Sequence, residues 1–410
     1  QQIVDSGRVV KGFESIDVSA NQEFFLWHTW FSDVFNRSAD NKGVSGFDIV
    51  IGNPPYVSVR TKNFDVSLKP TYKQNFDLAV GQYDLYVLFI EQSYRLLDCK
   101  GTLSFIVPTR LLSNENFMPA RLFLKDKLFI NRYVNAEAPF ETATVEANIM
   151  VCSKIRKNER VASYSYDSKS KTFDLLVLAD RGIIESMPFS IFPFVYNDSI
   201  ISLFSKIQKA NTTPLGNYLE ITRGLECGYK DSCITTNKTR FPLMKAEQIK
   251  RFFIEGSSEL YCIPDFKNPS KFKTKEVFEK KPKLVTKFCS GDIQFALDEI
   301  GYYNTNSVYN CSVGDLETAY LLMGILNCPV STFWFNVAYM NIDGLFPHIQ
   351  KNQLESIPIP VLNKEKKGEL IGLVKQFITT KDNVILKQIY KNVYSFYNLE
   401  DSEIKIIESM

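Results

Sequence analysis

Histidine is nearly missing from this chain, since His28 and His348 are the only two among 410 residues. The eight cysteines are scattered and form no CxxC pair. So small a supply of imidazole argues against a catalytic triad built on histidine, and the cysteine spacing argues against a zinc site or any other metal centre. We expect reduced thiols and a location in a prokaryotic cytoplasm.

The sequence also lacks a long apolar run and a strong excess of charge. No stretch approaches the roughly 20 apolar residues that cross a bilayer, and residues 320–335 are interrupted by Asn327 and Pro329. The net charge is only +2, and aromatic residues make up 13% of the chain. We therefore expect no membrane segment, two or three domains with a sizeable core, and only a local surface for nucleic acid.

The most informative stretch runs from residue 47 to residue 57 and reads FDIVIGNPPYV. Residues 47–51 form a short apolar run rich in β-branched residues, which predicts a buried strand that ends at Gly52. Pro54 and Pro55 then fix φ and remove two backbone N–H groups, so the chain leaves the strand as a stiff, extended loop. Ligands of open α/β sheets bind at this end of a strand.

The loop presents one side-chain amide, two carbonyl groups and one aromatic ring. Such a set suits a planar base with an exocyclic amine. The side-chain oxygen of Asn53 and the carbonyl of Pro54 can accept the two N–H groups of an adenine N6 amine, while Tyr56 stacks on the ring. A strand that simply ends in a proline turn is the alternative interpretation.

This stretch resembles motif IV of the amino-group DNA methyltransferases, and its context resembles the adenine-N6 enzymes of the type IIG, Eco57I-like restriction-modification family. The segments FFLWHTWFSDVF before it, and YDLYVLFIEQSYRLL, GTLSFIVPTRLL and APFETATVEANIMVCSK after it, resemble the corresponding family segments. The resemblance implies S-adenosylmethionine as cofactor, double-stranded DNA as partner, and Mg²⁺ only if a nuclease domain lies upstream. It implies four catalytic residues: Asn53, Pro54, Pro55 and Tyr56.

The order of elements after this motif predicts an α/β fold. Residues 81–98 have a helical apolar pattern, and residues 102–107, 129–135 and 148–153 are strand candidates. This order is typical of the carboxyl half of a Rossmann-like methyltransferase sheet. No GxG loop follows a strand upstream, where the family binds its cofactor, and the chain starts without methionine. We therefore expect a fragment that binds S-adenosylmethionine weakly or not at all and is inactive in isolation.

The family also places an aromatic residue in the loop before its last strand, where it stacks on an extruded adenine opposite the tyrosine of motif IV. Phe140, in APFET, falls at that place. A core phenylalanine beneath a loop is the alternative. Methyl transfer needs mainly alignment, so we expect Asp48, Asp84 and Glu141 to be structural or positioning residues and not proton shuttles.

The second half resembles a TaqI-like target-recognition domain with an α+β fold. The resemblance lies in LGNYLEITRGLECGYKDSCIT, in YLLMGILNCPVSTFWFNV, in IPIP, and in the closing IYKNVYSFYNLEDSEIKIIE. We expect a partial methyltransferase domain over 1–160 and a connecting segment over 161–210. A target-recognition domain over 211–362 and a C-terminal helical segment over 363–410 would follow.

Residues 267–287 hold eight lysines against two glutamates, with phenylalanines interleaved. Such a local excess favours contact with DNA phosphates, and a solvated surface is the alternative. We expect Arg223 and Arg240 to read base edges, because planar guanidinium groups match them. The lysines expected at the DNA are Lys271, Lys273, Lys275, Lys280, Lys281, Lys283 and Lys287.

The sequence thus favours a fragment of a site-specific adenine-N6 DNA methyltransferase from a restriction-modification enzyme. Such an enzyme flips its target adenine out of the duplex, and its second half recognises the DNA sequence. Two alternatives stay open: a sequence-specific DNA-binding module without activity of its own, and part of a phage-defence methyltransferase without a nuclease.

Overall fold

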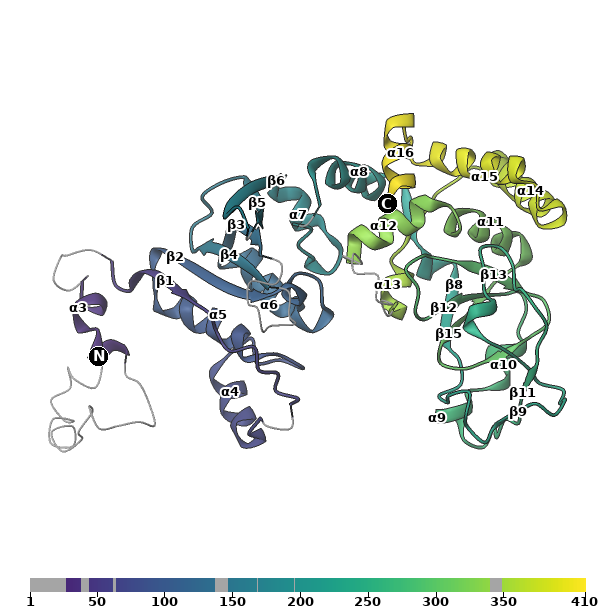
Figure 1. The fold of residues 1–410 in the computed structure, drawn as a ribbon, viewed down its shortest axis with the longest axis horizontal. Coiled ribbons are helices and arrows are strands. Elements are labelled where there is room, and N and C mark those ends of the chain that lie inside the picture. The colour runs from purple at the N-terminus through teal and green to yellow at the C-terminus, as the bar shows by residue number, and fades with distance from the viewer. Residues whose placement is uncertain are drawn as a thin grey trace.

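The chain forms two lobes in its computed structural model (Figure 1). The first lobe is built on one six-stranded sheet, and the second carries two four-stranded sheets with helices packed at one end. The residues that the structure describes are 27–37, 44–61, 64–136, 147–167, 169–194, 196–339 and 349–410.

The six-stranded sheet has the strand order β1-β2-β4-β3-β5-β6. Its strands are β1 Phe47–Gly52, β2 Leu97–Pro108, β3 Phe129–Asn135, β4 Ala147–Ser153, β5 Arg160–Asp167 and β6 Thr172–Asp180. The pairs β1/β2 and β3/β5 are parallel, and the other neighbours are antiparallel. The four predicted strands and the mixed α/β class are therefore confirmed.

Helices cover this sheet and link its strands. They are α2 Trp27–Trp30, α3 Ser32–Phe35, α4 Lys69–Asn75, α5 Leu85–Leu96, α6 Met118–Asp126, α7 Arg181–Ser186 and α8 Asp198–Lys209. The predicted helix after residue 81 is α5, which is buried on most sides because its sequence is apolar almost all round. It crosses from β1 to β2, as a parallel pair requires.

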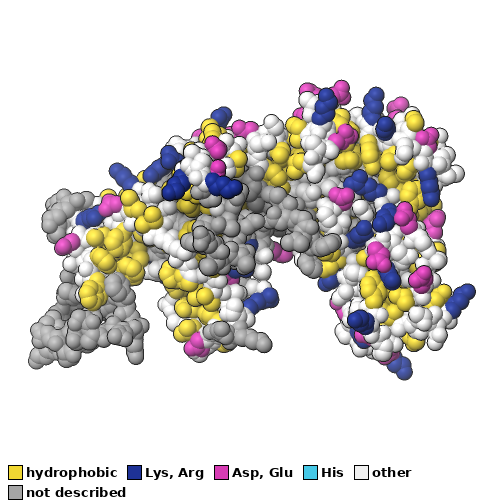
Figure 2. All heavy atoms as spheres, viewed as in Figure 1, with side chains coloured by type: hydrophobic (Ala, Val, Ile, Leu, Met, Phe, Trp, Pro, Cys, Tyr) yellow, Lys and Arg dark blue, Asp and Glu magenta, His cyan; other side chains and the backbone are white. Residues whose placement is uncertain are grey.

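The strand β1 is not buried, in contrast to the prediction. It lies at the edge of the sheet and pairs only with β2, so that Ile49 and Ile51 are 66% and 79% exposed. The rings of Trp27 in α2, Phe35 in α3 and Phe31 between them pack on Phe47, the first residue of the strand. Figure 2 shows hydrophobic side chains gathered between α3 and β1.

The segment expected to connect the domains, residues 161–210, contributes to the sheet. Its first part forms most of the hairpin of β5 and β6, and its last part forms α8. The alternation in β6 is weak because the strand lies at the other edge of the sheet, where Phe173 and Leu175 are exposed. Burial therefore does not select an apolar face along the whole strand.

In the second lobe the two sheets have the orders β13-β12-β15-β8 and β14-β10-β11-β9. The strands are β8 Leu219–Arg223, β9 Ile234–Thr235, β10 Pro242–Met244, β11 Leu260–Cys262, β12 Lys283–Lys287, β13 Phe295–Asp298, β14 Tyr303–Asn304 and β15 Val308–Val313. Two short helices, α9 Pro269–Phe272 and α10 Lys275–Glu279, lie between β11 and β12. This α+β arrangement agrees with the expectation for the second half.

Further helices complete the described part of the second lobe. They are α11 Leu316–Leu326, α12 Pro329–Tyr339, α13 Lys351–Glu355, α14 Lys364–Thr380, α15 Asn383–Phe396 and α16 Asp401–Ser409. The C-terminal helical segment expected over residues 363–410 is interrupted where Lys381 adopts a left-handed conformation and Asp382 caps α15. The IPIP segment is extended as expected: β16 Pro358–Pro360 pairs with β7 Thr212–Pro214.

In the described part of the chain, no single helix is both long and apolar enough to cross a membrane. Helices α11 and α12 reach the required length and composition only as a pair, and they are bent by 67° at the break between them.

The two lobes meet where α8 packs on α12. The rings of Phe204 and Trp334 stack with centroids 5.9 Å apart, and the Trp334 indole donates to Gln208 at 2.9 Å. The Tyr196 hydroxyl donates to the Asn336 carbonyl at 2.9 Å. One large cluster contains buried hydrophobic residues of both lobes, so a core is continuous across this contact. Smaller separate clusters lie within the lobes.

Arg121 of α6 is fully buried against the neighbouring turns. Its guanidinium donates to the carbonyls of Ser190, Leu111 and Asn114 at 3.1, 3.0 and 2.6 Å. Burial lowers the pKa of Arg121 to about 10. The five N–H groups of a guanidinium suit a buried site where several backbone carbonyls converge, because water does not reach these carbonyls to donate hydrogen bonds.

We expect Arg121→Met to lower the free energy of unfolding by roughly 3–5 kcal/mol, because it leaves buried carbonyls without donors. Urea denaturation measures this loss. Arg132→Met is the matched control, since Arg132 is exposed on β3, and a change within about 0.5 kcal/mol is expected there. Equal stability of the two variants would contradict the structural role of Arg121.

The lysine-rich segment also contains a buried charge. Lys283 forms an ion pair of 2.9 Å with Asp298, and both side chains are at most 1% exposed. The ammonium group also donates to the carbonyls of Phe278 and Tyr302. Burial lowers the pKa of Lys283, and the Asp298 carboxylate opposes that shift. The prediction that Lys283 contacts DNA is therefore wrong: it is a core residue.

Lys283→Met should lower the free energy of unfolding by roughly 3–5 kcal/mol, since it leaves the Asp298 carboxylate buried without its cation. Lys280→Met is the control, because Lys280 is exposed three residues away. If thermal and urea melts show both variants as stable as the wild type, the pair contributes nothing to folding.

Candidate functional site

The loop from Asn53 to Tyr56 starts at the carboxyl end of β1. Gly52, the last residue of β1, lies opposite Phe105 on the parallel strand β2. Asn53 and Pro55 are exposed, whereas Pro54 is buried. The loop therefore lies where open α/β sheets bind ligands, as the sequence predicts.

Backbone hydrogen bonds hold the far end of this loop. The Leu85 N–H donates to the Val57 carbonyl at 2.9 Å, and the Val59 N–H donates to the Tyr83 carbonyl at 3.2 Å. Between them Ser58 and Asp84 form an isolated antiparallel bridge. The loop is thus fastened to the residues that start α5.

Asp84 reinforces this attachment. Its buried carboxylate pairs with Arg110, which follows β2 and is about half exposed. Burial raises the pKa of Asp84, while Arg110 and the Ser58 hydroxyl oppose the shift. Asp48, by contrast, is exposed and pairs with Arg37 at 2.8 Å. Both carboxylates therefore have ion-pair partners in the fold.

Two hydrogen-bond acceptors of the loop are open. Within the described residues, neither the Asn53 side chain nor the Pro54 carbonyl makes a hydrogen bond. Two adjacent prolines supply no N–H that could claim these oxygens locally. The loop can therefore accept hydrogen bonds from a ligand at no loss of its own.

Tyr56 is half buried and offers a ring surface. Its hydroxyl is enclosed and has no hydrogen-bond partner in the described part of the chain. Burial raises the pKa of Tyr56. The ring meets Tyr86 edge-on, with centroids 6.1 Å apart. Phe140 and Glu141 lie outside the described residues.

Most lysines of the 267–287 run have partners in the second lobe. Lys271 pairs with Asp231 at 2.8 Å, and that contact lowers the pKa of Asp231 to about 2. The partners of the others are Glu226 for Lys273, Glu279 for Lys275, the Glu299 carbonyl for Lys281 and Gln294 for Lys287. Lys280 is exposed and makes no side-chain contact with the described residues. The run is thus largely a paired surface.

The two arginines expected at base edges differ. Arg223 donates to the Asn306 carbonyl at 2.7 Å and lies 3.7 Å from the centroid of the Phe288 ring, so the fold already uses its guanidinium. Arg240 is exposed and rests on Phe241 at 4.6 Å. Of these two, Arg240 has the guanidinium that can turn to a ligand.

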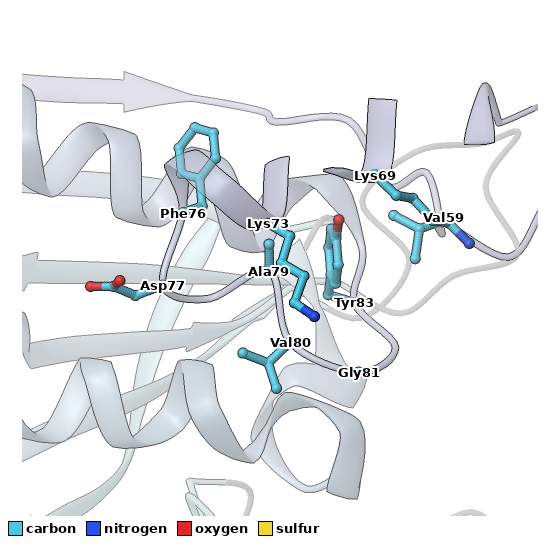
Figure 3. Close-up of a pocket in the computed structure, with 9 residues that line it drawn as sticks. All are labelled: Val59, Lys69, Lys73, Phe76, Asp77, Ala79, Val80, Gly81 and Tyr83. Atoms are coloured by element: carbon cyan, nitrogen blue, oxygen red, sulfur yellow. The ribbon is translucent and has the colours of Figure 1, made fainter. Parts of the chain in front are cut away.

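Sequence reasoning missed a pocket beside the loop. It has a cavity volume of about 470 Å³ and lies between α4 and the turn before α5 (Figure 3). Lys69 and Lys73 of α4 line it together with Val59 and Tyr83. The available signal was the four-residue spacing of two lysines in KPTYK, close after the motif.

Two family models match the chain. The Eco57I restriction-modification methylase model matches residues 2–140, and the TaqI-like C-terminal specificity domain model matches residues 241–359. The first match contains the Asn53–Tyr56 loop, and the second contains both sheets of the second lobe apart from β8 and β9.

Curated relatives support the same assignment. The type II restriction enzyme and methyltransferase RM.Eco57I of Escherichia coli is 32% identical over 25% of this chain and 10% of its own length. The type II methyltransferase M.TthHB8I of Thermus thermophilus is 40% identical over 19% of each protein. A Methanocaldococcus jannaschii sequence assigned as a type II restriction enzyme and methyltransferase is 23% identical over 86% of this chain. The chain spans about a third of that relative, 31%.

A solved structure shows the same fold over most of the chain. The type IIL restriction-modification enzyme MmeI, in complex with DNA, superimposes with a TM-score of 0.54 at 13% identity, over 88% of this chain and 56% of that one. Residues 2–140 are therefore similar to part of an Eco57I-type restriction-modification methylase, and residues 241–359 are similar to a TaqI-like C-terminal specificity domain.

Proposed function

We propose that this chain supplies the base-binding and sequence-recognition parts of a site-specific adenine-N6 DNA methyltransferase of a restriction-modification system. The observation that carries the proposal is the pair of open acceptors, the Asn53 side chain and the Pro54 carbonyl, beside the Tyr56 ring. An amine with two N–H groups, attached to a flat ring, complements this set.

The chain's own residues prepare the base for methylation. Asn53 and Pro54 accept both hydrogens of the N6 amine, which frees the nitrogen lone pair and moves the nitrogen toward sp³ geometry. Tyr56 stacks on the adenine after it leaves the duplex, and Phe140 stacks on the opposite face. Asp84, through Ser58, keeps the loop in place. Alignment and a freed lone pair would carry the transfer: the nitrogen bonds the methyl carbon as its bond to sulfur breaks, and the methylated amine loses one proton to solvent.

S-adenosylmethionine would supply the electrophilic methyl group. The residues present fit the acceptor side of this reaction, since Asn53 lies at the carboxyl end of a parallel edge strand. Within the described ranges, no GxG loop follows a strand. Asn53 and Tyr56 are the residues of this chain that we propose to act on the base.

The second lobe is proposed to read the DNA sequence. Its match to a specificity domain and the fold shared with MmeI, a structure in complex with DNA, support this role. Figure 2 shows the molecule hollowed between the lobes, with α4 on one side and α9 on the other. Arg240 offers a planar donor group for base edges, and Lys280 offers a charge for phosphates.

In the full-length protein, Asn53→Ala should abolish methylation and leave duplex affinity within about twofold, because the removed acceptor acts on the amine and not on the backbone. Transfer of tritiated methyl groups to plasmid DNA and gel-shift titration measure the two properties. Asn158→Ala, at an exposed asparagine of the same lobe, is the control. Methylation at the normal rate by Asn53→Ala would refute the proposed function.

Tyr56→Ala and Phe140→Ala should each weaken capture of the flipped base by about 1–3 kcal/mol. Tyr56→Phe should be close to wild type, because the hydroxyl makes no hydrogen bond with the described residues. Fluorescence of 2-aminopurine at the target position reports base extrusion. If Phe140→Ala methylates normally, Phe140 is a core residue and has no stacking role.

A further inference from the structure

The pocket beside the candidate site presents two cations on one helix face. Lys69 and Lys73 are four residues apart on α4, so their side chains extend from the same side of the helix. Figure 3 shows the Tyr83 ring between the two lysine side chains, and the Asp77 carboxylate directed away from both ammonium groups. The charge that faces this pocket is therefore positive.

These two lysines differ from most lysines of the 267–287 run because no acid among the described residues compensates their charges. Among the described residues, neither Lys69 nor Lys73 forms an ion pair or a side-chain hydrogen bond. Lys69 is half buried, whereas Lys73 is exposed. An ammonium group held at a concave surface without an anion is the arrangement that attracts one from solution.

The rest of the pocket is apolar and turns sharply. Val59, Ala79, Val80 and Tyr83 form much of its wall, next to Gly81, whose φ is +62°. The Gly81 N–H makes no hydrogen bond with the described residues. A cavity of about 470 Å³ with apolar walls and two cations suits a phosphate group together with the sugar attached to it.

The pocket belongs to the same segment as the base-binding loop. Val59 follows Tyr56 by three residues, and its N–H is bonded to the carbonyl of Tyr83, which also lines the pocket. A ligand in the pocket and a base stacked on Tyr56 would thus be held by one short piece of backbone. A polynucleotide is a ligand that reaches both places at once.

We propose that the Lys69–Lys73 pocket binds a backbone phosphate of the DNA next to the target adenine. This inference rests on the proposed function and assigns it a positioning site. Rotation of a nucleotide out of the duplex turns the base about its backbone. Lys69 and Lys73 anchor the phosphate about which the nucleotide turns, and the apolar wall packs on the deoxyribose.

The first test is the salt dependence of binding to a 30-bp duplex of random sequence by the full-length protein. One phosphate contact, at about 0.9 in the slope of log K against log salt, makes affinity fall roughly 3.5-fold more between 50 and 200 mM salt. Lys69→Ala/Lys73→Ala should lose this extra dependence. The control Lys169→Ala/Lys405→Ala, which removes two exposed lysines elsewhere, should retain the wild-type slope. An unchanged slope in the Lys69/Lys73 variant would overturn the proposal.

The second test locates the phosphate. After the methylated site has been mapped on plasmid DNA, duplexes carry a neutral methylphosphonate at single positions around the target adenine. The wild type should lose about tenfold in affinity at one phosphate adjacent to that adenine, and Lys69→Ala/Lys73→Ala should lose nothing further there. Equal losses for both proteins would overturn the proposal.

Methylation measured in parallel separates this inference from the proposed function. If the wild type methylates DNA, but the affinity losses from the methylphosphonate and from the lysine substitutions are additive, only the phosphate pocket is wrong. If methylation is absent while the salt slopes differ as expected, the pocket binds DNA and the methyltransferase assignment fails. If inorganic phosphate binds the wild type but not the variant, and duplex affinity is equal in both, the pocket takes free phosphate and the DNA assignment is wrong.

Discussion

The hydrogen bonds between residues 57–59 and residues 83–85 are the constraint on which the candidate site depends. They fasten a loop stiffened by two prolines to the start of a buried helix, α5. Without them the loop would be held by β1, an edge strand, and by the contact of the Tyr56 ring with Tyr86. The two prolines fix φ, so the anchored loop is rigid. They also lack N–H groups, so the carbonyl oxygens of the loop have no local hydrogen-bond donors. Rigidity and open acceptors together are what a base-binding loop requires.

Buried charge is the second organising feature, and it explains why a count of lysines misleads. Lys283 lies in the densest part of the basic run, yet its ammonium group is enclosed by Asp298 and two carbonyls. Lys69 and Lys73 lie outside the run, and no acid among the residues that the structure describes pairs with them. A run of like residues in sequence reports average composition. Whether an ammonium group is available depends on the acid that the fold brings to it from elsewhere, here from β13.

The local sequence pattern predicted the elements of the first lobe correctly where their burial does not depend on a distant part of the chain. The strands at 129–135 and 148–153 are internal to the sheet, so their apolar runs correctly indicate that they are buried. The same pattern failed for β1, whose apolar residues look alike whether a further element covers them or not. Asn53 and Tyr56 were found from a motif that combines backbone stiffness with chemistry. The pocket at Lys69 was missed because α4, the turn at Gly81 and Val59 meet only in three dimensions.

The joint between the lobes bears on how such a protein would select one adenine. Trp334 stacks on Phe204 and is bonded to Gln208, and the hydrophobic core continues through this contact. Closely packed interiors transmit displacement and do not absorb it. A base sequence read by the second lobe would therefore lie at a set distance from the Asn53 loop in the first. In the proposed enzyme, the spacing between the recognised sequence and the methylated adenine is then a property of the α8–α12 contact and not of either lobe alone.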